Sequence, residues 1–345
     1  MSVEDPKLPA QVAAEVATEV PEDGTPVRRP VDRTPSLKDA MPLLKMMPYL
    51  TYEAVMHAAS LRNAAHGWDL RSHLIVSMVR KYMSGSGKTI EELQMASKKG
   101  MPVEFKGLDI LPLYIPKPTD SDCEFLSHAI ITAKDKLTKD VGMPGPTIPD
   151  PEIVEVPAEW IVSSQKEKRA DFICGENDVV IIYAHGGAHY LGSAEAHRFI
   201  TGQFAESTKV NILSIDYRLS PQNPLPSALT DMLVSYLYVL ETQHVPANHV
   251  FFAGDSSGGC LVLSMLEVIL YSDDQAKRMH VPAGIVTISP WVDQSRCLPS
   301  ESSKELAQFD YIPEANFYPN FKPSPSWPAE NKRYWVSETS VKSIQ

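Results

Sequence analysis

The feature that most constrains this chain is the segment Gly254–Gly259, which reads Gly-Asp-Ser-Ser-Gly-Gly and directly follows the apolar run Val250–Ala253. A Gly-x-Ser-x-Gly pattern between a strand and a helix is typical of a nucleophile elbow, a sharp and strained turn that exposes its serine. Small residues are needed around that serine because backbone segments approach closely there. The pattern therefore predicts a strand–turn–helix unit with Ser256 as the nucleophile. The alternative is a plain Gly/Ser turn before a helix.

A second segment, His185–Ala188, reads His-Gly-Gly-Ala and also follows an apolar run, Ile181–Tyr183. When a serine attacks a carbonyl carbon, the carbonyl oxygen becomes an oxyanion that backbone N–H groups stabilise. A glycine-containing loop upstream of the elbow is where such donors belong. The donors that we predict are the backbone N–H groups of Gly186, Gly187 and Ser257.

Between these segments the chain reads Asp-Tyr-Arg-Leu-Ser-Pro at 216–221 and Asn-Pro-Leu-Pro-Ser-Ala-Leu at 223–229. Together with the His-Gly-Gly block, the elbow and Ile288–Asp293, this pattern resembles the hormone-sensitive-lipase-like family of α/β-hydrolases over roughly residues 150 to 295. The resemblance implies an α/β-hydrolase fold, in which helices cover both faces of a mostly parallel sheet, with an N-terminal helical cap. It also implies a serine hydrolase of carboxylic esters (esterase or lipase-like) that forms an acyl-serine intermediate.

Several residues around these motifs are expected to support them. Asp216 and Arg218 are predicted to pair and so to fix the loop after their strand. Asp255, beside the nucleophile, is predicted to hold the elbow through backbone hydrogen bonds. The complete set of supporting residues is His185, Ala188, Gly254, Asp255, Gly258, Gly259, Asp216 and Arg218.

The partners of the serine are not recognisable. In α/β-hydrolases an acid and then a histidine follow the serine along the chain, but the only histidine after Ser256 is His280. It precedes the apolar run Gly284–Ile288, at the entry end of a strand, whereas the site forms at the carboxyl ends. Asp273 and Asp274 precede His280 in the same badly placed loop. We therefore expect a C-terminally truncated chain in which the last strands of the fold are missing.

Two other accounts of the missing partners stay open. One is a non-catalytic homologue that binds a small molecule without turning it over. The other is a base recruited from His189 or His197, which lie in and after the oxyanion loop. His197 is more typical of a structural hydrogen-bonding residue, and His189 is expected to face the substrate pocket.

The order of apolar runs predicts the organisation of the chain. Short apolar runs alternate with helical patterns from about residue 152, which favours a parallel sheet covered on both faces. We expect a disordered tail over 1–35, a helical cap region over 36–150 and an incomplete hydrolase core over 151–345. Expected strands are 152–156, 160–162, 179–183, 210–215, 250–253 and 284–288, and expected helices are 194–206, 227–241 and 258–271.

Gly85–Thr89 looks like the end of a P-loop, but Tyr82 stands where the first glycine of that motif belongs. Thr89 and Glu92 are instead predicted to form a helix capping box.

Composition limits the partners. The formal net charge of −11 argues against a nucleic-acid surface and against a patch for anionic membranes. The four cysteines have no Cys-x-x-Cys spacing, so no metal site, redox pair or cofactor is predicted. Neither a signal peptide nor a transmembrane run is apparent, which favours an intracellular, cytoplasmic protein. We expect a small-molecule or lipid ester as substrate. The apolar helical pattern from residue 43 onward leaves contact with a lipid surface open, and the oligomeric state is not predicted.

Overall fold

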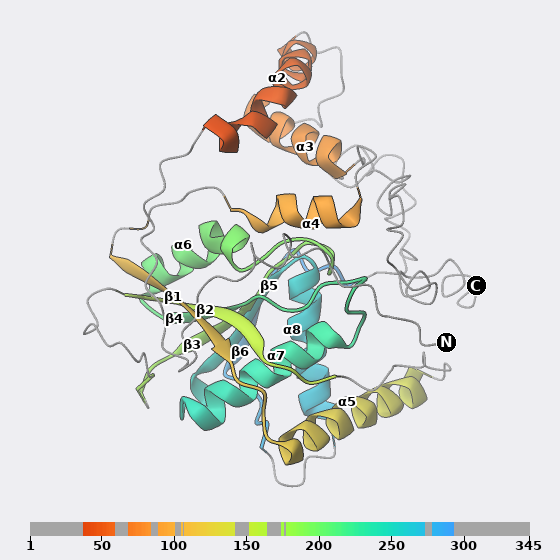
Figure 1. Cartoon of the computed structure of the whole chain (residues 1–345), viewed down its shortest axis with the longest axis vertical. Coiled ribbons are helices and arrows are strands. Elements are labelled where there is room, and N and C mark those ends of the chain that lie inside the picture. The colour runs from red at the N-terminus through yellow and green to blue at the C-terminus, as the bar shows by residue number, and fades with distance from the viewer. Residues whose placement is uncertain are drawn as a thin grey trace, which may run out of the picture.

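Figure 1 shows a computed structural model of the chain. The tail predicted over 1–35 and the region after 292 lie outside the described residues. The structure describes residues 37–58, 68–83, 89–100, 105, 107–141, 152–163, 174–175, 177–272 and 278–292.

In this described part, six strands form one sheet in the order β1-β2-β4-β3-β5-β6. The pairs β4–β3, β3–β5 and β5–β6 are parallel, whereas β1–β2 and β2–β4 are antiparallel. The predicted mostly parallel sheet is therefore confirmed. The strands are β1 (Leu108–Ile115), β2 (Val156–Ser163), β3 (Val180–Ala184), β4 (Asn211–Ile215), β5 (Val250–Asp255) and β6 (Gly284–Ile288).

The first two strands differ from the prediction. A single strand, β2, replaces the two expected at 152–156 and 160–162, and β1 lies inside the region predicted to be helical. Proline explains both errors. Pro112 lies in β1, an edge strand, where a missing N–H breaks no ladder. Pro157 is the second residue of β2, and the pairing with β4 begins only at Ala158.

Helices cover both faces of the sheet, as expected. On one face α6 (Arg198–Thr208) packs against a cluster that includes Tyr183 and Ile212. On the other face α7 (Ser227–Leu237) and α8 (Ser257–Tyr271) pack over Phe252. The helix between β1 and β2, α5 (Asp120–Val141), packs mainly on α8 (Figure 1). Short helical turns are η1 (Glu195–His197), η2 (Tyr238–Thr242) and η3 (Ala247–His249).

Of the three N-terminal helices, the first two pair with each other, and the third packs on the loop after β3, where Ile90 and Leu93 contact Tyr190 and Leu191. Helices α2 (Leu37–Ala58) and α3 (Leu70–Met83) pack on each other, and α4 (Ile90–Lys98) lies between them and the rest of the molecule (Figure 1). The capping box is confirmed, because the Thr89 side chain accepts the Glu92 N–H and the Glu92 side chain accepts the Thr89 N–H. None of the helices in the described ranges is both long and apolar enough to cross a bilayer.

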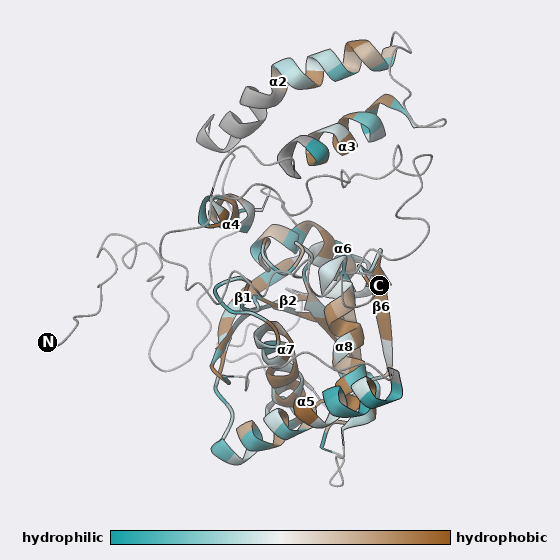
Figure 2. Cartoon of the chain, turned by 90° about the vertical axis from the view of Figure 1, so that its right-hand side faces the viewer, coloured by the Kyte–Doolittle hydropathy of each residue, from teal (hydrophilic) through white to brown (hydrophobic). Residues whose placement is uncertain are grey.

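The strand β6 forms the second edge of the described sheet. It appears in Figure 2 as a mostly hydrophobic arrow at the side of the molecule. Its side chains Val286 and Ile288 are 45% and 37% exposed. No described strand pairs with the outer side of β6, so β6 is an edge of the described sheet.

Candidate active site

Ser256 occupies the strained turn that the sequence predicts. It lies between β5 and α8 with φ 50° and ψ −119°, a conformation that non-glycine residues rarely adopt. A Cβ on Gly258 would clash with the carbonyl oxygen of Ala184, so this close approach requires glycine. The turn is fixed at its outer side as well, because the Ser256 N–H donates to the Ile288 carbonyl at 2.9 Å.

The loop that begins at His185 lies against this elbow. Its Gly186 N–H donates to Asp255 Oδ1 at 2.9 Å, so the prediction that Gly186 is an oxyanion donor is wrong for this geometry. Sequence spacing places this N–H near the nucleophile but does not reveal that the neighbouring carboxylate already accepts it. Among the described residues, the N–H groups of Gly187 and Ser257 have no acceptor. These two groups remain the predicted donors, and Gly187, at φ +125°, needs to be glycine.

Asp255 connects the elbow to three neighbours. Its carboxylate accepts hydrogen bonds from the Tyr183 hydroxyl at 2.7 Å and from the Gly186 N–H, and lies 3.6 Å from His197 Nε2. Burial alone would raise the pKa of Asp255, but the contacts with His197, Tyr183 and Gly186 outweigh it and hold the pKa below its usual value. The Asp255 carboxylate thus links the elbow to the loop that begins at His185, and its predicted role in holding the elbow stays a prediction.

Two of the histidines near the site, His185 and His197, are held by structural contacts. His185 is fully buried, stacks on Tyr217 with ring centroids 4.2 Å apart, and contacts the Gly186 carbonyl through Nδ1 at 2.7 Å. Burial, with a further contribution from nearby His197, lowers the pKa of His185 to about 3. His197 contacts the Ser193 carbonyl through Nδ1 at 3.1 Å and Asp255 through Nε2. Both rings are thus held as structural groups, as predicted for His197.

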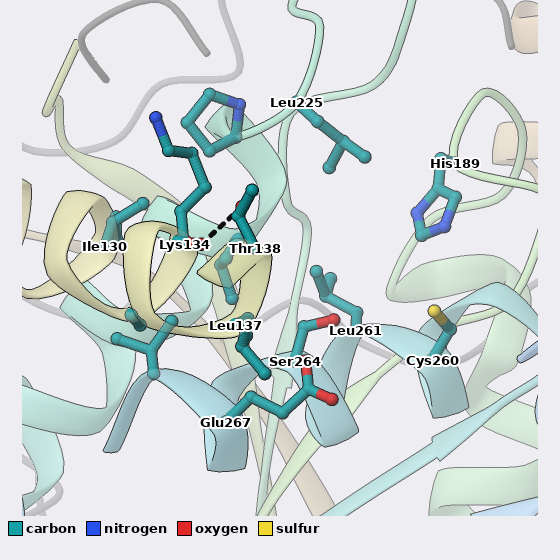
Figure 3. A pocket seen from close by; sticks show the side chains of 14 residues that line it. Ile130, Lys134, Leu137, Thr138, His189, Leu225, Cys260, Leu261, Ser264 and Glu267 are labelled. Atoms are coloured by element: carbon teal, nitrogen blue, oxygen red, sulfur yellow. Dashed lines mark hydrogen bonds between the residues drawn. The ribbon is translucent and has the colours of Figure 1, made fainter. Parts of the chain in front are cut away.

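His189 is placed differently. It lies in the same loop with φ 64°, and its N–H donates to the Ser257 hydroxyl at 3.2 Å. Burial lowers the pKa of its imidazole to about 4, so the ring is neutral at pH 7 and a weak base. Its side chain lines a pocket of about 270 Å³, together with residues of α5, α7 and α8 (Figure 3).

The predicted pairing of Asp216 with Arg218 is wrong. The Arg218 guanidinium instead contacts both carboxylate oxygens of Asp231, at 2.8 to 3.1 Å. The backbone N–H of Arg218 donates to the same carboxylate. Asp216 accepts the Ala194 N–H at 3.3 Å. Asp231 is the only charged residue in α7 and is 1% exposed. A lone acid in an apolar helix was the signal that this residue has a buried partner.

His280 lies at the edge predicted for it. In the parallel register of β5 and β6, Phe251 is opposite Gly284 and Asp255 is opposite Ile288. His280 precedes Gly284, whereas Ser256 follows Asp255, so the two residues lie at opposite ends of these strands. The described site therefore holds Ser256, the predicted nucleophile, and two predicted oxyanion donors, whereas His280 lies at the other end of the strands.

Comparisons with known proteins place this geometry among hydrolases. Residues 181–317 match the family described as alpha/beta hydrolase fold. An acetyl-hydrolase of Streptomyces hygroscopicus is 31% identical over 136 residues, which cover 39% of this chain and 40% of the relative. An esterase of Acinetobacter venetianus is 32% identical over 133 residues, covering 39% and 41% of the two chains. The chain thus spans about two fifths of the length of these curated relatives.

One solved structure is also similar to part of this chain. A hormone-sensitive lipase from a metagenome library is 29% identical, with a TM-score of 0.39, over 52% of this chain and 53% of that one.

Proposed function

We propose that this chain, which resembles the hormone-sensitive-lipase-like α/β-hydrolases, acts on carboxylic esters through an acyl intermediate on Ser256. The observation that carries the proposal is the strained elbow itself. A positive φ at a serine is costly, and such strain is typical of functional sites. Support also comes from the position of Ser256, which directly follows the carboxyl end of β5 and precedes Ser257, the first residue of α8.

In this mechanism the Ser256 hydroxyl attacks the ester carbonyl carbon, and the carbonyl oxygen becomes an oxyanion held by the Gly187 and Ser257 N–H groups. Collapse of the tetrahedral intermediate expels the alcohol and leaves the acyl group on Ser256. Water then attacks the acyl carbon and releases the acid. Both steps are fast only when a base accepts a proton from the attacking group, which is the Ser256 hydroxyl in the first step and water in the second.

The base is the weak point of the described site. The imidazoles of His185 and His197 are held by structural contacts, and the pKa of His189 is lowered to about 4. We therefore infer that this chain acylates slowly and deacylates even more slowly, so that an activated ester leaves an acyl-enzyme that accumulates.

Steady-state hydrolysis is a poor test of this proposal, because slow deacylation limits the turnover that it measures. The sharper test is the stoichiometry of nitrophenol release from p-nitrophenyl butyrate. The chain should release about one equivalent, with the acyl group retained on the protein, and Ser256→Ala should release none in that phase. An equal first phase in the two proteins would contradict the proposal.

A second candidate function is small-molecule binding without turnover. The pocket beside His189, with no strong base at its edge, is the observation that favours it. A ligand that raises the melting temperature without any covalent change at Ser256 would support this alternative.

A further inference from the structure

Helix α4 turns one face toward two loops of the site. The residues of this face recur at steps of three and four positions, which is the spacing of one side of a helix: Ile90, Leu93, Gln94 and Ser97. The first two are apolar and form a buried cluster with residues of the oxyanion loop, which we define as residues 185–193. The last two are polar, so this half of the face can hold its neighbours through hydrogen bonds.

Gln94 supplies the buried polar group of this face. Its side chain is 8% exposed. Its Nε2 donates to the Gln222 Oε1 at 3.0 Å, and its Oε1 accepts from the Gln222 Nε2 at 2.9 Å. The same Nε2 donates to the Ser220 carbonyl at 3.0 Å. Both ends of the amide are thus bonded to a segment that lies 126 to 128 positions further along the chain.

Ser220 carries this connection to the oxyanion loop and the elbow. Its N–H donates to the His189 carbonyl at 2.9 Å. The His189 N–H in turn donates to the hydroxyl of Ser257 at 3.2 Å. A continuous series of hydrogen bonds therefore runs from Gln94 to Ser257, whose own N–H is one of the two predicted oxyanion donors.

The same helix holds the far end of the oxyanion loop. The Ser97 hydroxyl accepts the Gly192 N–H at 3.0 Å and donates to the Gln94 carbonyl at 2.9 Å. One residue later, the Lys98 carbonyl accepts the Ser193 hydroxyl at 2.7 Å. Helix α4 is thus bonded to the end of the loop directly and to its middle through Ser220.

The oxyanion loop needs such support because its backbone is strained. Ala188 and His189 follow each other at φ 56° and 64°, a region that non-glycine residues rarely occupy. Strained conformations of this kind persist only where the surrounding structure fixes them. Gly187, whose N–H is the other predicted donor, directly precedes them. A loop released from α4 would therefore relax and change the direction of this N–H.

We propose that Gln94 is a positioning residue, which holds the oxyanion loop in its strained conformation through Ser220 and so keeps the N–H groups of Gly187 and Ser257 aimed at the oxyanion. The proposal rests on the proposed function for the role of these two donors. The hold of Gln94 on the loop stands on the geometry alone. Because an oxyanion forms only in the transition state, Gln94 should affect the maximal rate of acylation and not the binding of the ester.

Hydrogen exchange followed by mass spectrometry tests the hold on the loop without any chemistry at Ser256. Gln94→Met keeps the length of the side chain and removes its three hydrogen bonds, so amides in 186–193 should exchange about tenfold faster while those of β5 stay unchanged. Gln222→Met removes two of the three bonds at an exposed position and should give a smaller increase. Gln203→Met makes the same change at an exposed position of α6 and should have no effect.

The first phase of nitrophenol release from p-nitrophenyl butyrate tests the consequence for acylation. In Gln94→Met its maximal rate constant should fall about 10- to 100-fold, because donors that are displaced by a fraction of an ångström lose most of their effect. The ester concentration at half-maximal rate should not change. Gln94→Lys combined with Gln222→Glu replaces the amide pair by an ion pair whose ammonium can still donate to the Ser220 carbonyl, and should restore most of the rate.

The two measurements separate this proposal from the proposed function. Unchanged loop exchange in the variants of Gln94 and Gln222 that fold would overturn the proposal, and so would faster exchange with an unchanged rate constant. Because Gln222 is exposed, its variant decides the question even where Gln94→Met does not fold. Faster loop exchange, combined with no first phase in any protein including wild type, would support the hold of Gln94 on the loop and contradict the assignment of Ser256.

Discussion

Asp255 Oδ1 accepts the N–H of Gly186 at 2.9 Å, although 69 positions separate the two residues in the chain. This bond joins the residue before Ser256, the proposed nucleophile, to the loop that is predicted to hold the oxyanion. One carboxylate therefore links the elbow to that loop. Predictions about the elbow follow from this contact.

Replacing Asp255 with Asn should destabilise the fold by about 1–3 kcal/mol at pH 7, because buried donors lose a charged acceptor. The pKa of Asp255 is lowered in the folded protein, so its contribution to stability is present above the unfolded-state pKa and is lost as the pH falls through the folded value. The difference in melting temperature between wild type and Asp255→Asn should thus stay constant from pH 7 to 5 and shrink below about pH 4. A difference that grows on acidification would contradict this account.

Gly258→Ala should destabilise the protein by about 1–3 kcal/mol, since its methyl group would overlap the Ala184 carbonyl oxygen. Gly175→Ala is the matched control, because the nearest atom to its added methyl group is 3.8 Å away. Chemical unfolding should show a lower free energy of unfolding for Gly258→Ala and an unchanged one for Gly175→Ala. Equal stability of the two would mean that the elbow does not pack as closely as described.

Arg218→Ala should cost about 3–5 kcal/mol, because it leaves the buried Asp231 carboxylate without its partner. Burial already raises the pKa of Asp231 against the lowering effect of Arg218, so the variant should raise it further. A carboxyl with a raised folded pKa favours the folded state as it becomes protonated. The difference in the free energy of unfolding between wild type and Arg218→Ala should therefore be smaller at pH 5 than at pH 7.

Arg278→Ala is the control for that measurement. Arg278 contacts Asp122 and Glu241 near the surface, with the Glu241 side chain 43% exposed. Such pairs contribute about 0–1 kcal/mol. If Arg278→Ala lowers the free energy of unfolding as much as Arg218→Ala does, the large effect of Arg218→Ala does not come from the burial of Asp231.

Val286→Lys should reduce self-association of this chain, because a charge on an exposed edge strand opposes pairing with another strand. Its effect on the free energy of unfolding should stay within about 0.5 kcal/mol. Light scattering during storage measures the association. Leu270→Lys makes a similar change at an exposed position of α8 and should leave the scattering unchanged. Lower scattering in both variants would point to net charge rather than to the edge strand.

The sequence predicted the centre of this fold better than its margins. β3 to β6 lie within two residues of their predicted bounds, because each is a short, mostly apolar run. β1 was missed because Pro112 reads as a strand breaker, and only the edge position of the strand makes it harmless.

The site was predicted at the level of motifs and not of individual bonds. The strained conformation of Ser256 follows from local spacing. The partner of Arg218 and the acceptor of the Gly186 N–H do not, because both depend on how distant segments pack. Spacing identifies which groups meet at a strand end, but not which hydrogen bonds they form.

The central claim is that Ser256 is the nucleophile, and covalent labelling by a fluorophosphonate, mapped to its peptide by mass spectrometry, tests it most directly. The neighbouring hydroxyl provides the control. Wild type and Ser257→Ala should both acquire the label at position 256, slowly compared with an esterase that has its base, and Ser256→Ala should acquire none. Labelling that persists in Ser256→Ala, or that is lost in Ser257→Ala while Ser256 stays unlabelled, would contradict the account.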